Sequence, residues 1–577
     1  MSLEEFRRAW PSGSLGAVLD HEPQPLQFGT SGRRGLLTHL TQLEIFINAL
    51  AELEYLQSLP QAEGGIAAGE TFFFASDLRP ISTALDEGGR GELAQAIETA
   101  IAAAGMRPVY LGAIPTPALT AYALAQGRGS IMVTGSHIPF DRNGYKTNTA
   151  HGELLKHHEG PIDQKVSQVR ARLYRQPSEN SPFDAGGNFK SGHRELPPAD
   201  GSAEAAYVRR YAAFLGAEAL EGLRLVVYQH SAVGRDLLPR ILRELGATVI
   251  EAGRSDTFVP IDTENIDQAR LAAMQALVDA AVTEHGPMDA LVSTDGDSDR
   301  PLIMGVDRGN GQARFFGGDL VGMVTAEFLG ADAVVVPVSC NDAIDRGPLR
   351  HCLEPKTRIG SPFVIAGMEA ARARGRRAVC GWEANGGFLT GTDLHRDGKT
   401  LTALPTRDAV LPIVSVLAAA HAEGVPLIAL FDRLPARYSR AALLPQFPKA
   451  RSRAIIARYS PQDPDARVVT FSQGRVAVDG AEPSAAMAGA LLTIREGLAR
   501  HFSRDRGFAG IAGLNYTDGV RMLFGNGDVA HLRPSGNADE LRIYVVADTQ
   551  DRADAIAAMA VAEPDGILRS LERELTA

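Results

Sequence analysis

Short apolar runs alternate with amphipathic stretches along the first three quarters of the chain. Phe72–Ser76 and Leu223–Tyr228 have the length of strands, and residues 92–104 carry apolar side chains at the spacing of one helix face. The run Ala290–Ser293 follows another amphipathic stretch at about 264–284. Strand runs that alternate with helical patterns predict parallel sheets covered by helices. We therefore expect three consecutive α/β units before about residue 434.

The pattern changes after that point. Arg467–Thr470 and Val476–Val478 are short strand-like runs, and Val520–Phe524 and Val529–Arg533 flank Gly525-Asn526-Gly527-Asp528, a sequence typical of a hairpin turn. This part of the chain predicts an α+β domain built on an antiparallel sheet.

These patterns divide the chain into four predicted domains, with limits at 25–203, 204–310, 311–433 and 434–577. Within the first of them, residues 155–203 resemble an inserted region with a basic helix near Gln164–Arg175, to which no chemistry can be attached.

Polar, glycine-containing loops follow three of the predicted strands. The first is Thr134-Gly135-Ser136-His137-Ile138-Pro139, the second is Thr294–Arg300, and the third is Gly381–Gly387. Strands of α/β folds present functional side chains at their carboxyl ends. Each loop also has an alternative interpretation in which it is purely structural. In that case the serine would cap a turn, the acidic loop would cap a helix, and Glu-Ala-Asn would form a turn.

The second loop places Asp295, Asp297 and Asp299 within a short span. Three carboxylates so close together repel one another by several kcal/mol at an effective dielectric of about 20, unless a cation lies among them. An oxygen-only site of this kind suits Mg²⁺.

At this point the chain resembles the α-D-phosphohexomutase superfamily, which includes phosphoglucomutases, phosphomannomutases and phosphoglucosamine mutases. That family carries a phosphoserine loop, a D-G-D-x-D-R metal loop, a G-E-x-[S/N]-G sugar loop and a phosphate-binding R-x-S-x-T loop in this order, and all four positions are occupied here. Its opening motif F-G-T-[S/D]-G-x-R-G is matched by Phe28–Gly35. The resemblance implies three Rossmann-like α/β domains with mixed sheets and a C-terminal α+β domain around a central cleft.

The resemblance also implies roles for individual residues. The implied catalytic residues are Ser136, His137, Lys146, Arg34 and Arg300. The implied metal ligands are Ser136, Asp295, Asp297 and Asp299. The implied sugar-binding residues are Glu383 and Asn385, and the implied phosphate-binding residues are Arg533, Ser535, Gly536 and Asn537. The loop Thr357–Ser361 resembles the loop that the family's third domain brings to the cleft.

The chain departs from the family pattern at three places. Ile138 follows Ser-His where the family usually has Asn, and Gly387 stands where many bacterial members have a histidine. The phosphate loop continues Ser-Gly-Asn-Ala-Asp rather than Ser-Gly-Thr-Glu-Pro. The details of proton transfer and of phosphate binding are therefore not determined by the motifs.

Composition limits the class of protein further. A chain of 577 residues is too long to fold around a single hydrophobic core, so it should contain several domains. Its net charge of −11 argues against nucleic acid or an anionic membrane as the main partner. Three cysteines without metal-ligand spacing suit a reducing cytoplasm. No secretory signal and no apolar run of roughly 18 residues, the length of a membrane span, is present.

Together with these limits, the resemblance implies a cytoplasmic, Mg²⁺-dependent phosphohexomutase, a monomer or homodimer, acting on mannose or glucose phosphates. Glucose 1,6-bisphosphate or mannose 1,6-bisphosphate is the expected activator. Phosphoglucosamine or phosphoacetylglucosamine mutase is the alternative within the class. Two alternatives lie outside the mutase class: the chain is a metal-dependent phosphatase, or it is a catalytically silent sugar-phosphate sensor.

Overall fold

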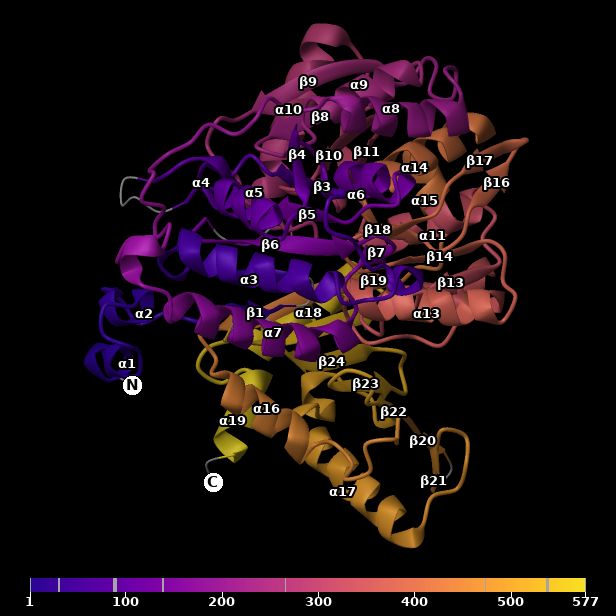
Figure 1. Ribbon diagram of the computed structural model, residues 1–577. Coiled ribbons are helices and arrows are strands. Elements are labelled where there is room, and N and C mark those ends of the chain that lie inside the picture. Colours follow the sequence, from indigo (N-terminus) through magenta and orange to yellow (C-terminus); the bar gives the residue numbers. More distant parts are fainter. Residues whose placement is uncertain are drawn as a thin grey trace.

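A computed structural model describes residues 2–29, 32–86, 91–136, 138, 140–264, 266–472, 474–535 and 539–575. Its strands form four larger sheets, each built from consecutive segments of the chain, and a small two-stranded ribbon. We refer to the parts that carry these sheets as the first, second, third and fourth units (Figure 1). The first three are α/β units with mixed sheets and the fourth is α+β, which confirms the predicted fold class.

The first unit contains a seven-stranded sheet in the order β1-β2-β6-β5-β3-β4, with β7 paired to β6. Its strands are β1 (Gln27–Phe28), β2 (Arg33–Leu36), β3 (Thr71–Ser76), β4 (Arg107–Ala113), β5 (Ser130–Val133), β6 (Arg142–Thr149) and β7 (Gly152–Glu153). Its helices are α1 (Leu3–Arg8), α2 (Leu15–Val18), α3 (Gln42–Leu56), α4 (Pro80–Thr83), α5 (Leu93–Ala103), α6 (Thr116–Ala125) and α7 (Lys156–Tyr174). Strands β3, β4 and β5 are parallel, whereas β6 returns antiparallel to β5.

Helix α7 differs from its prediction. It begins well before Gln164, and its side chains Ile162, Val169 and Leu173 belong to the first unit's core, where α7 packs against α3. Pro161 lies inside the helix and hid this continuity in the sequence, because proline usually ends a helical pattern. The start of the supposed insertion is therefore part of the unit itself.

The second unit has a five-stranded sheet in the order β12-β11-β10-β8-β9. Its elements are β8 (Arg224–His230), β9 (Thr248–Arg254), β10 (Ala290–Thr294), β11 (Pro301–Val306), β12 (Ala313–Phe315), α8 (Ser202–Leu215), α9 (Leu237–Glu244) and α10 (Gln268–His285). Strand β10 runs parallel to β8 and antiparallel to β11, so the acidic loop joins two central strands.

The third unit has the sheet β13-β14-β15-β18 and the ribbon β16-β17. Its strands are β13 (Ala333–Val335), β14 (Val379–Trp382), β15 (Phe388–Thr390), β16 (Leu394–Arg396), β17 (Lys399–Leu401) and β18 (Leu404–Asp408). Its helices are α11 (Gly318–Phe328), α12 (Ala343–Arg346), α13 (Ser361–Ala373), α14 (Val410–Glu423) and α15 (Leu427–Phe431).

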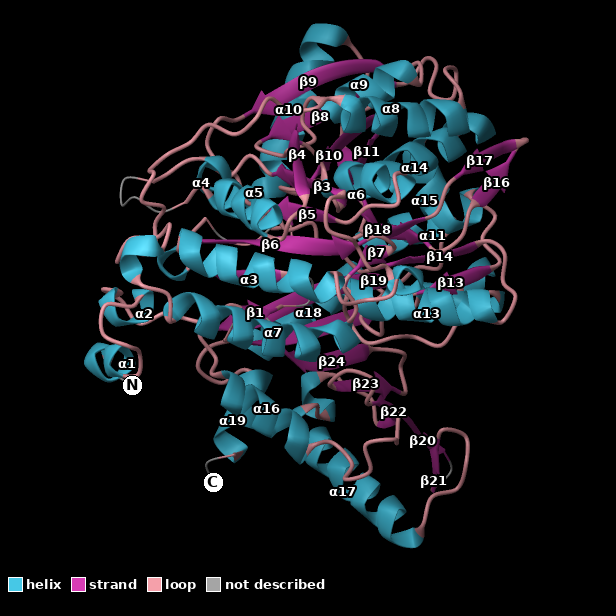
Figure 2. Ribbon diagram, in the orientation of Figure 1, coloured by secondary structure: helices cyan, strands magenta, loops and turns pink. Residues whose placement is uncertain are grey.

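The fourth unit has a seven-stranded antiparallel sheet in the order β19-β25-β24-β23-β22-β20-β21. Its strands are β19 (Tyr438–Pro445), β20 (Val468–Ser472), β21 (Arg475–Val478), β22 (Ile511–Asn515), β23 (Val520–Phe524), β24 (Val529–Pro534) and β25 (Glu540–Ala547). Its helices are α16 (Lys449–Arg458), α17 (Ala485–His501), α18 (Gln550–Val561) and α19 (Ile567–Glu574). Figure 2 shows α17 extending away from the rest of the molecule beside β20 and β21.

Apolar side chains of the first three units meet in one continuous core, which includes Phe73, Leu225, Val292, Trp382 and Val414. This core fixes the sheets of the three units relative to one another, and with them the loops at the carboxyl ends of their strands. Among the described helices, none is long and apolar enough to cross a membrane.

Candidate active site

Ser136 lies in the turn between β5 and β6 and is buried, with a φ of 53°. A non-glycine residue in this left-handed region is uncommon and needs support from its surroundings. Asp77, at the end of β3, provides it: its Oδ2 accepts hydrogen bonds from Thr134 Oγ1 at 2.8 Å and from the Gly135 N–H at 3.2 Å. The backbone of Ser136 in turn donates to Thr134 Oγ1 at 2.7 Å. The serine is thus held in one conformation.

Arg79 holds the other side of this loop. Its guanidinium donates to the carbonyl oxygen of Ser136 at 3.0 Å and of Ile138 at 2.5 Å, and its Cζ lies 4.1 Å from the centre of the Phe258 ring. A Cβ at Gly135 would lie 2.5 Å from Arg79 Cζ, so a larger residue would displace the guanidinium. Glycine is therefore required at 135 by the close approach of Arg79.

The acidic loop between β10 and β11 faces the serine. The Oγ of Ser136 donates to Asp295 Oδ2 at 3.0 Å, and one carboxylate oxygen from each of Asp295, Asp297 and Asp299 lies within 4.8 Å of the others. A Cβ at Gly296 would lie 2.6 Å from the Ser136 carbonyl oxygen, which explains a glycine within the loop. All three aspartates are fully buried.

Lys146 reaches the same carboxylates from β6, where its backbone pairs with Met132 of β5. Its Nζ donates to Asp297 Oδ2 at 2.6 Å and to Asp299 Oδ2 at 2.7 Å. The opposite oxygens, Asp297 Oδ1 and Asp299 Oδ1, are buried without a hydrogen-bond partner in the described part of the chain. Buried carboxylate oxygens that lack partners are costly unless a cation binds them, so the donor set fits Mg²⁺.

The three aspartates differ in their electrostatics. Burial raises the pKa of Asp295 well above its usual value, and the charges of Asp299 and Asp297 raise it further. Burial would also raise the pKa of Asp299, but Arg407 and Lys146 hold it below its usual range. Asp299 is thus an ionised carboxylate paired with cationic side chains.

Arg34 and Arg300 are the other cations of this cluster. Burial lowers the pKa of Arg34 to about 10; the charge of Asp297 opposes this shift, and those of Arg407 and Arg300 add to it. The Nε of Arg300 lies 3.6 Å from Asp299 Oδ1. Arg34, on β2, and Arg300, next to the acidic loop, therefore share one electrostatic environment.

Glu383 and Asn385 follow β14 and are both buried. Glu383 Oε2 accepts a hydrogen bond from Arg407 at 3.1 Å. Asn385 Oδ1 accepts from the Gly387 N–H at 3.0 Å, and its carbonyl oxygen accepts from Thr263 Oγ1 of the second unit at 2.9 Å. The third-unit loop is therefore anchored against the second unit.

Arg533 lies at the end of β24 in the fourth unit. Its Nε is 3.2 Å from Asp518 Oδ1, while Asp518 Oδ2 accepts a hydrogen bond from the Ile359 N–H at 2.9 Å. Ser535 is buried, and its N–H donates to the Glu540 carbonyl oxygen at 3.1 Å. The predicted phosphate loop and the predicted third-unit loop are thus joined through Asp518. Three other predicted site residues, His137, Gly536 and Asn537, lie outside the described residues.

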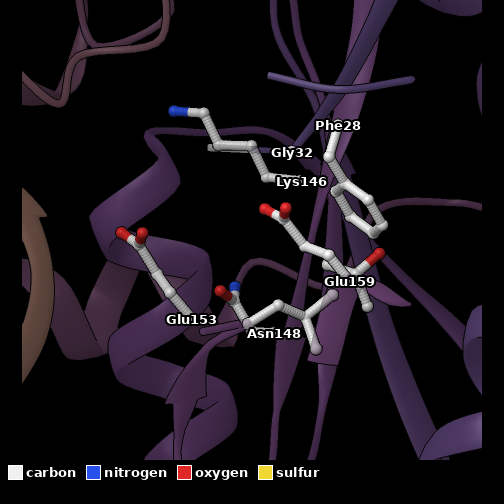
Figure 3. A pocket seen from close by; sticks show the side chains of 8 residues that line it. Phe28, Gly32, Lys146, Asn148, Glu153 and Glu159 are labelled. Carbon is white, nitrogen blue, oxygen red and sulfur yellow. The ribbon is translucent and has the colours of Figure 1, made fainter. Parts of the chain in front are cut away.

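A small cavity lies beside Lys146 (Figure 3). It is also lined by Phe28, Asn148, Glu153 and Glu159, and its volume is about 20 Å³. A single water needs ~10–15 Å³ in the same measure, so this cavity has no room for a sugar phosphate.

Three residues of this site were missed in the sequence. They are Arg407, which binds Glu383, and Arg79, which binds the carbonyl oxygen of Ser136. The third is Thr116, whose hydroxyl donates to Asp297 Oδ2 at 2.6 Å. Arg407 and Asp408 are the last two residues of the short strand β18, so polar residues at the end of a strand were the signal that could have identified Arg407. Thr116 begins α6, and nothing in its local sequence distinguishes it from a residue that starts a helix.

Comparison with known proteins gives four matches along the chain. The models described as Phosphoglucomutase/phosphomannomutase, alpha/beta/alpha domains I, II and III match residues 25–172, 205–309 and 317–438, and the model of the C-terminal domain matches residues 475–563.

Individual relatives agree with these matches. The chain is 36% identical to a phosphomannomutase of Sinorhizobium fredii over 540 residues, covering 93% of this chain and 98% of that protein. It is 27% identical to a phosphoglucosamine mutase of Haemophilus ducreyi, covering 59% of this chain and 70% of that protein. A crystal structure of a phosphoglucomutase/phosphomannomutase family protein from Burkholderia thailandensis has the same fold, with a TM-score of 0.58 and 17% identity over 93% of this chain and 98% of that one.

Proposed function

Because this chain belongs to the phosphoglucomutase/phosphomannomutase family, we propose that it interconverts the 1-phosphate and 6-phosphate of a hexose, mannose or glucose. The chain is an isomerase of the phosphohexomutase class. In our proposal Ser136 carries the phosphoryl group, and a hexose 1,6-bisphosphate is the bound intermediate.

The contact between Ser136 Oγ and the Asp295 carboxylate supports this proposal most directly. It places the serine hydroxyl against the acidic loop, where a phosphorylated serine needs a cation. Mg²⁺, held by Ser136, Asp295, Asp297 and Asp299, would neutralise charge on the transferring phosphoryl group.

Side chains near the acidic loop would stabilise the transferring phosphoryl group and accept the proton of the sugar hydroxyl. Lys146, already 2.6 and 2.7 Å from two aspartates, stabilises the phosphoryl oxygens as they change position, together with Arg34 and Arg300. A proton must leave the attacking sugar hydroxyl; His137 is one candidate to accept it, and Lys146 is the other if it has first given up a proton to become a neutral amine. Transfer of this kind depends mainly on positioning and charge neutralisation, for which the cluster is built.

The other half of the substrate would bind between the third and fourth units. Glu383 and Asn385 would bind adjacent sugar hydroxyls. Arg533, Ser535, Gly536 and Asn537 would bind the phosphate that is not being transferred. After the first transfer the bound bisphosphate reorients in the site. Its other phosphoryl group is then transferred to Ser136, which restores the phosphoserine.

We also propose that the fourth unit closes over the bound sugar and keeps water from the phosphoserine. The same proposal includes a location in the cytoplasm and a monomeric or homodimeric state. It also includes four domains with limits at 25–203, 204–310, 311–433 and 434–577. Phosphoglucosamine or phosphoacetylglucosamine mutase is the alternative substrate class. The fuller coverage of the phosphomannomutase relative favours mannose or glucose.

Intact mass before and after incubation with glucose 1,6-bisphosphate and Mg²⁺ tests the proposal. The wild type should gain one phosphate, about 80 Da, and Ser136→Ala should not. Removal of Mg²⁺ with EDTA should stop the gain. A protein that never gains or loses phosphate would exclude the mutase mechanism, and release of inorganic phosphate without isomerised sugar would indicate a phosphatase.

A further inference from the structure

We propose that Arg407 is a positioning residue that links the acidic loop of the second unit to the Glu383 loop of the third, and that Gly387 is a glycine because Arg407 runs across it. The inference rests on the proposed function, since it assigns the two loops to metal and sugar. Neither Arg407 nor Gly387 matches one of the family motifs recognised in the sequence.

Arg407 lies near the end of β18 and is only 3% exposed. Its Nε and one terminal nitrogen lie 3.0 and 2.9 Å from Asp299 Oδ2. The other terminal nitrogen donates to Glu383 Oε2 at 3.1 Å. One planar guanidinium therefore holds carboxylates of two loops that are far apart in the chain.

The path of this side chain depends on position 387. A Cβ added to Gly387 would lie 2.5 Å from Arg407 Cδ, 2.7 Å from its Cγ and 3.0 Å from its Cβ. The neighbouring Gly386 has a φ of +86°, in the region that favours glycine, but the φ of Gly387 lies outside that region. Gly387 is thus required by space rather than by backbone conformation.

The contacts of Arg407 determine which oxygen of Asp299 is left for a cation. Both Arg407 and Lys146 bind Oδ2, whereas Oδ1 has no hydrogen-bond partner among the described residues and has Arg300 Nε at the longer, ion-pair distance of 3.6 Å. The same guanidinium holds Glu383 by one oxygen. Arg407 therefore orients a metal ligand and a sugar ligand together, and a shift of either loop is transmitted to the other.

Lysine cannot replace this arrangement fully, because an ammonium is a point charge without the planar fork of a guanidinium. We expect Arg407→Lys to keep the pairing with Asp299 and to lose the hydrogen bond to Glu383. Arg407→Ala should lose both.

The experiment measures Mn²⁺ binding by electron paramagnetic resonance, together with kcat and KM for mannose 1-phosphate and glucose 1-phosphate. Outer-shell partners of metal ligands typically contribute about 10- to 100-fold to affinity or activity, so Arg407→Ala should weaken Mn²⁺ binding and lower kcat by factors in this range. Arg407→Lys should restore Mn²⁺ binding while the KM for the sugar phosphate stays raised.

Gly387→Ala provides an independent test. It should displace Arg407 and weaken Mn²⁺ binding, but it should have little further effect in the Arg407→Ala background, where the space is free. Arg170→Ala is the matched control, because Arg170 pairs with the buried Glu44 at 2.6 Å through two nitrogens within the first unit. It should lower the Tm and leave Mn²⁺ binding and the kinetic constants unchanged.

Folded Arg407→Ala with wild-type Mn²⁺ affinity, kcat and KM would overturn the inference, as would additive effects of Gly387→Ala and Arg407→Ala. Mn²⁺ binding to the three aspartates can be measured without substrate and without phosphoryl transfer. A wild type that never phosphorylates Ser136 would therefore exclude the proposed function, while the Mn²⁺ results would still decide the role of Arg407.

Discussion

The first three units and the fourth are held in the molecule in different ways. Phe73, Val292 and Trp382, one from each of the first three units, belong to a single apolar core. The core of the fourth unit is built, among the described residues, from side chains between Leu444 and Leu571 alone. In Figure 1 this unit lies below the other three, at the yellow end of the colour scale.

Polar contacts join the fourth unit to the third instead. Arg437, at the boundary, is buried and binds Asp342 at 2.6 and 3.0 Å and the Gly527 carbonyl oxygen at 2.6 Å. Asp518 bonds the Ile359 N–H. When two units separate, polar contacts of this kind are replaced by hydrogen bonds to water at a small net cost in free energy. Separating units that share an apolar core instead exposes apolar surface to water, which is unfavourable. The serine and acidic loops are therefore fixed by a shared core, and the predicted phosphate loop lies on the unit that we propose moves.

The largest effect should come from a change inside the fixed part. Lys146→Met removes the ammonium between Asp297 and Asp299, and kcat should fall by about 10²–10⁴-fold. Steady-state kinetics measure this loss, and Lys165→Met on α7 is the control. A fall of less than about twofold would exclude Lys146 from the chemistry.

Core substitutions should separate the two regions in calorimetry. Leu417→Ala in the shared core and Ile556→Ala in the core of the fourth unit each remove a buried side chain, at a cost of about 2–5 kcal/mol in the free energy of unfolding. We expect two unfolding transitions, with each substitution lowering the Tm of one. A single transition shifted equally by both would mean that the four units unfold together.

A smaller effect is expected at the movable part. Arg533→Ala should raise the KM for hexose phosphate by about 10- to 100-fold, since hydrogen bonds to charged groups contribute ~1.5–3 kcal/mol. It should leave the phosphorylation of Ser136 by a saturating bisphosphate nearly unchanged. If kcat falls and KM does not, Arg533 acts in the transfer itself.

The smallest effect should be a pH dependence of the fourth unit's stability. Burial lowers the pKa of His531 to about 4, against its usual 6.5, with the Asp518 carbonyl oxygen opposing the shift and Arg521 adding to it. Between these values the unfolded chain binds the proton and the folded one does not. Stability should therefore be constant above about pH 6.5 and fall by roughly 1–3 kcal/mol as the pH drops toward 4. Thermal unfolding of the wild type and of His531→Gln at several pH values measures this; a variant with the same pH slope would refute the assignment.

The sequence alone determined the order of the elements and much of the candidate site. Apolar runs identified β3, β8 and β10, and the residues after strands identified Ser136 and the three aspartates. These signals are local, because a strand and the loop at its end are adjacent in the chain. The interruption of α7 by Pro161 was misleading for the same reason, since a local breaker is outweighed when the helix packs into a core.

Only the tertiary structure decided which charges meet. Lys146 and Asp297 are separated by 151 residues, and Arg407 and Asp299 by 108. No local pattern encodes such a pair, since its distance depends on how three sheets pack around the shared core. The contact that explains Gly387 is of this kind: the residue has no side chain because another strand brings an arginine across it, and burial between two carboxylates holds that arginine in place.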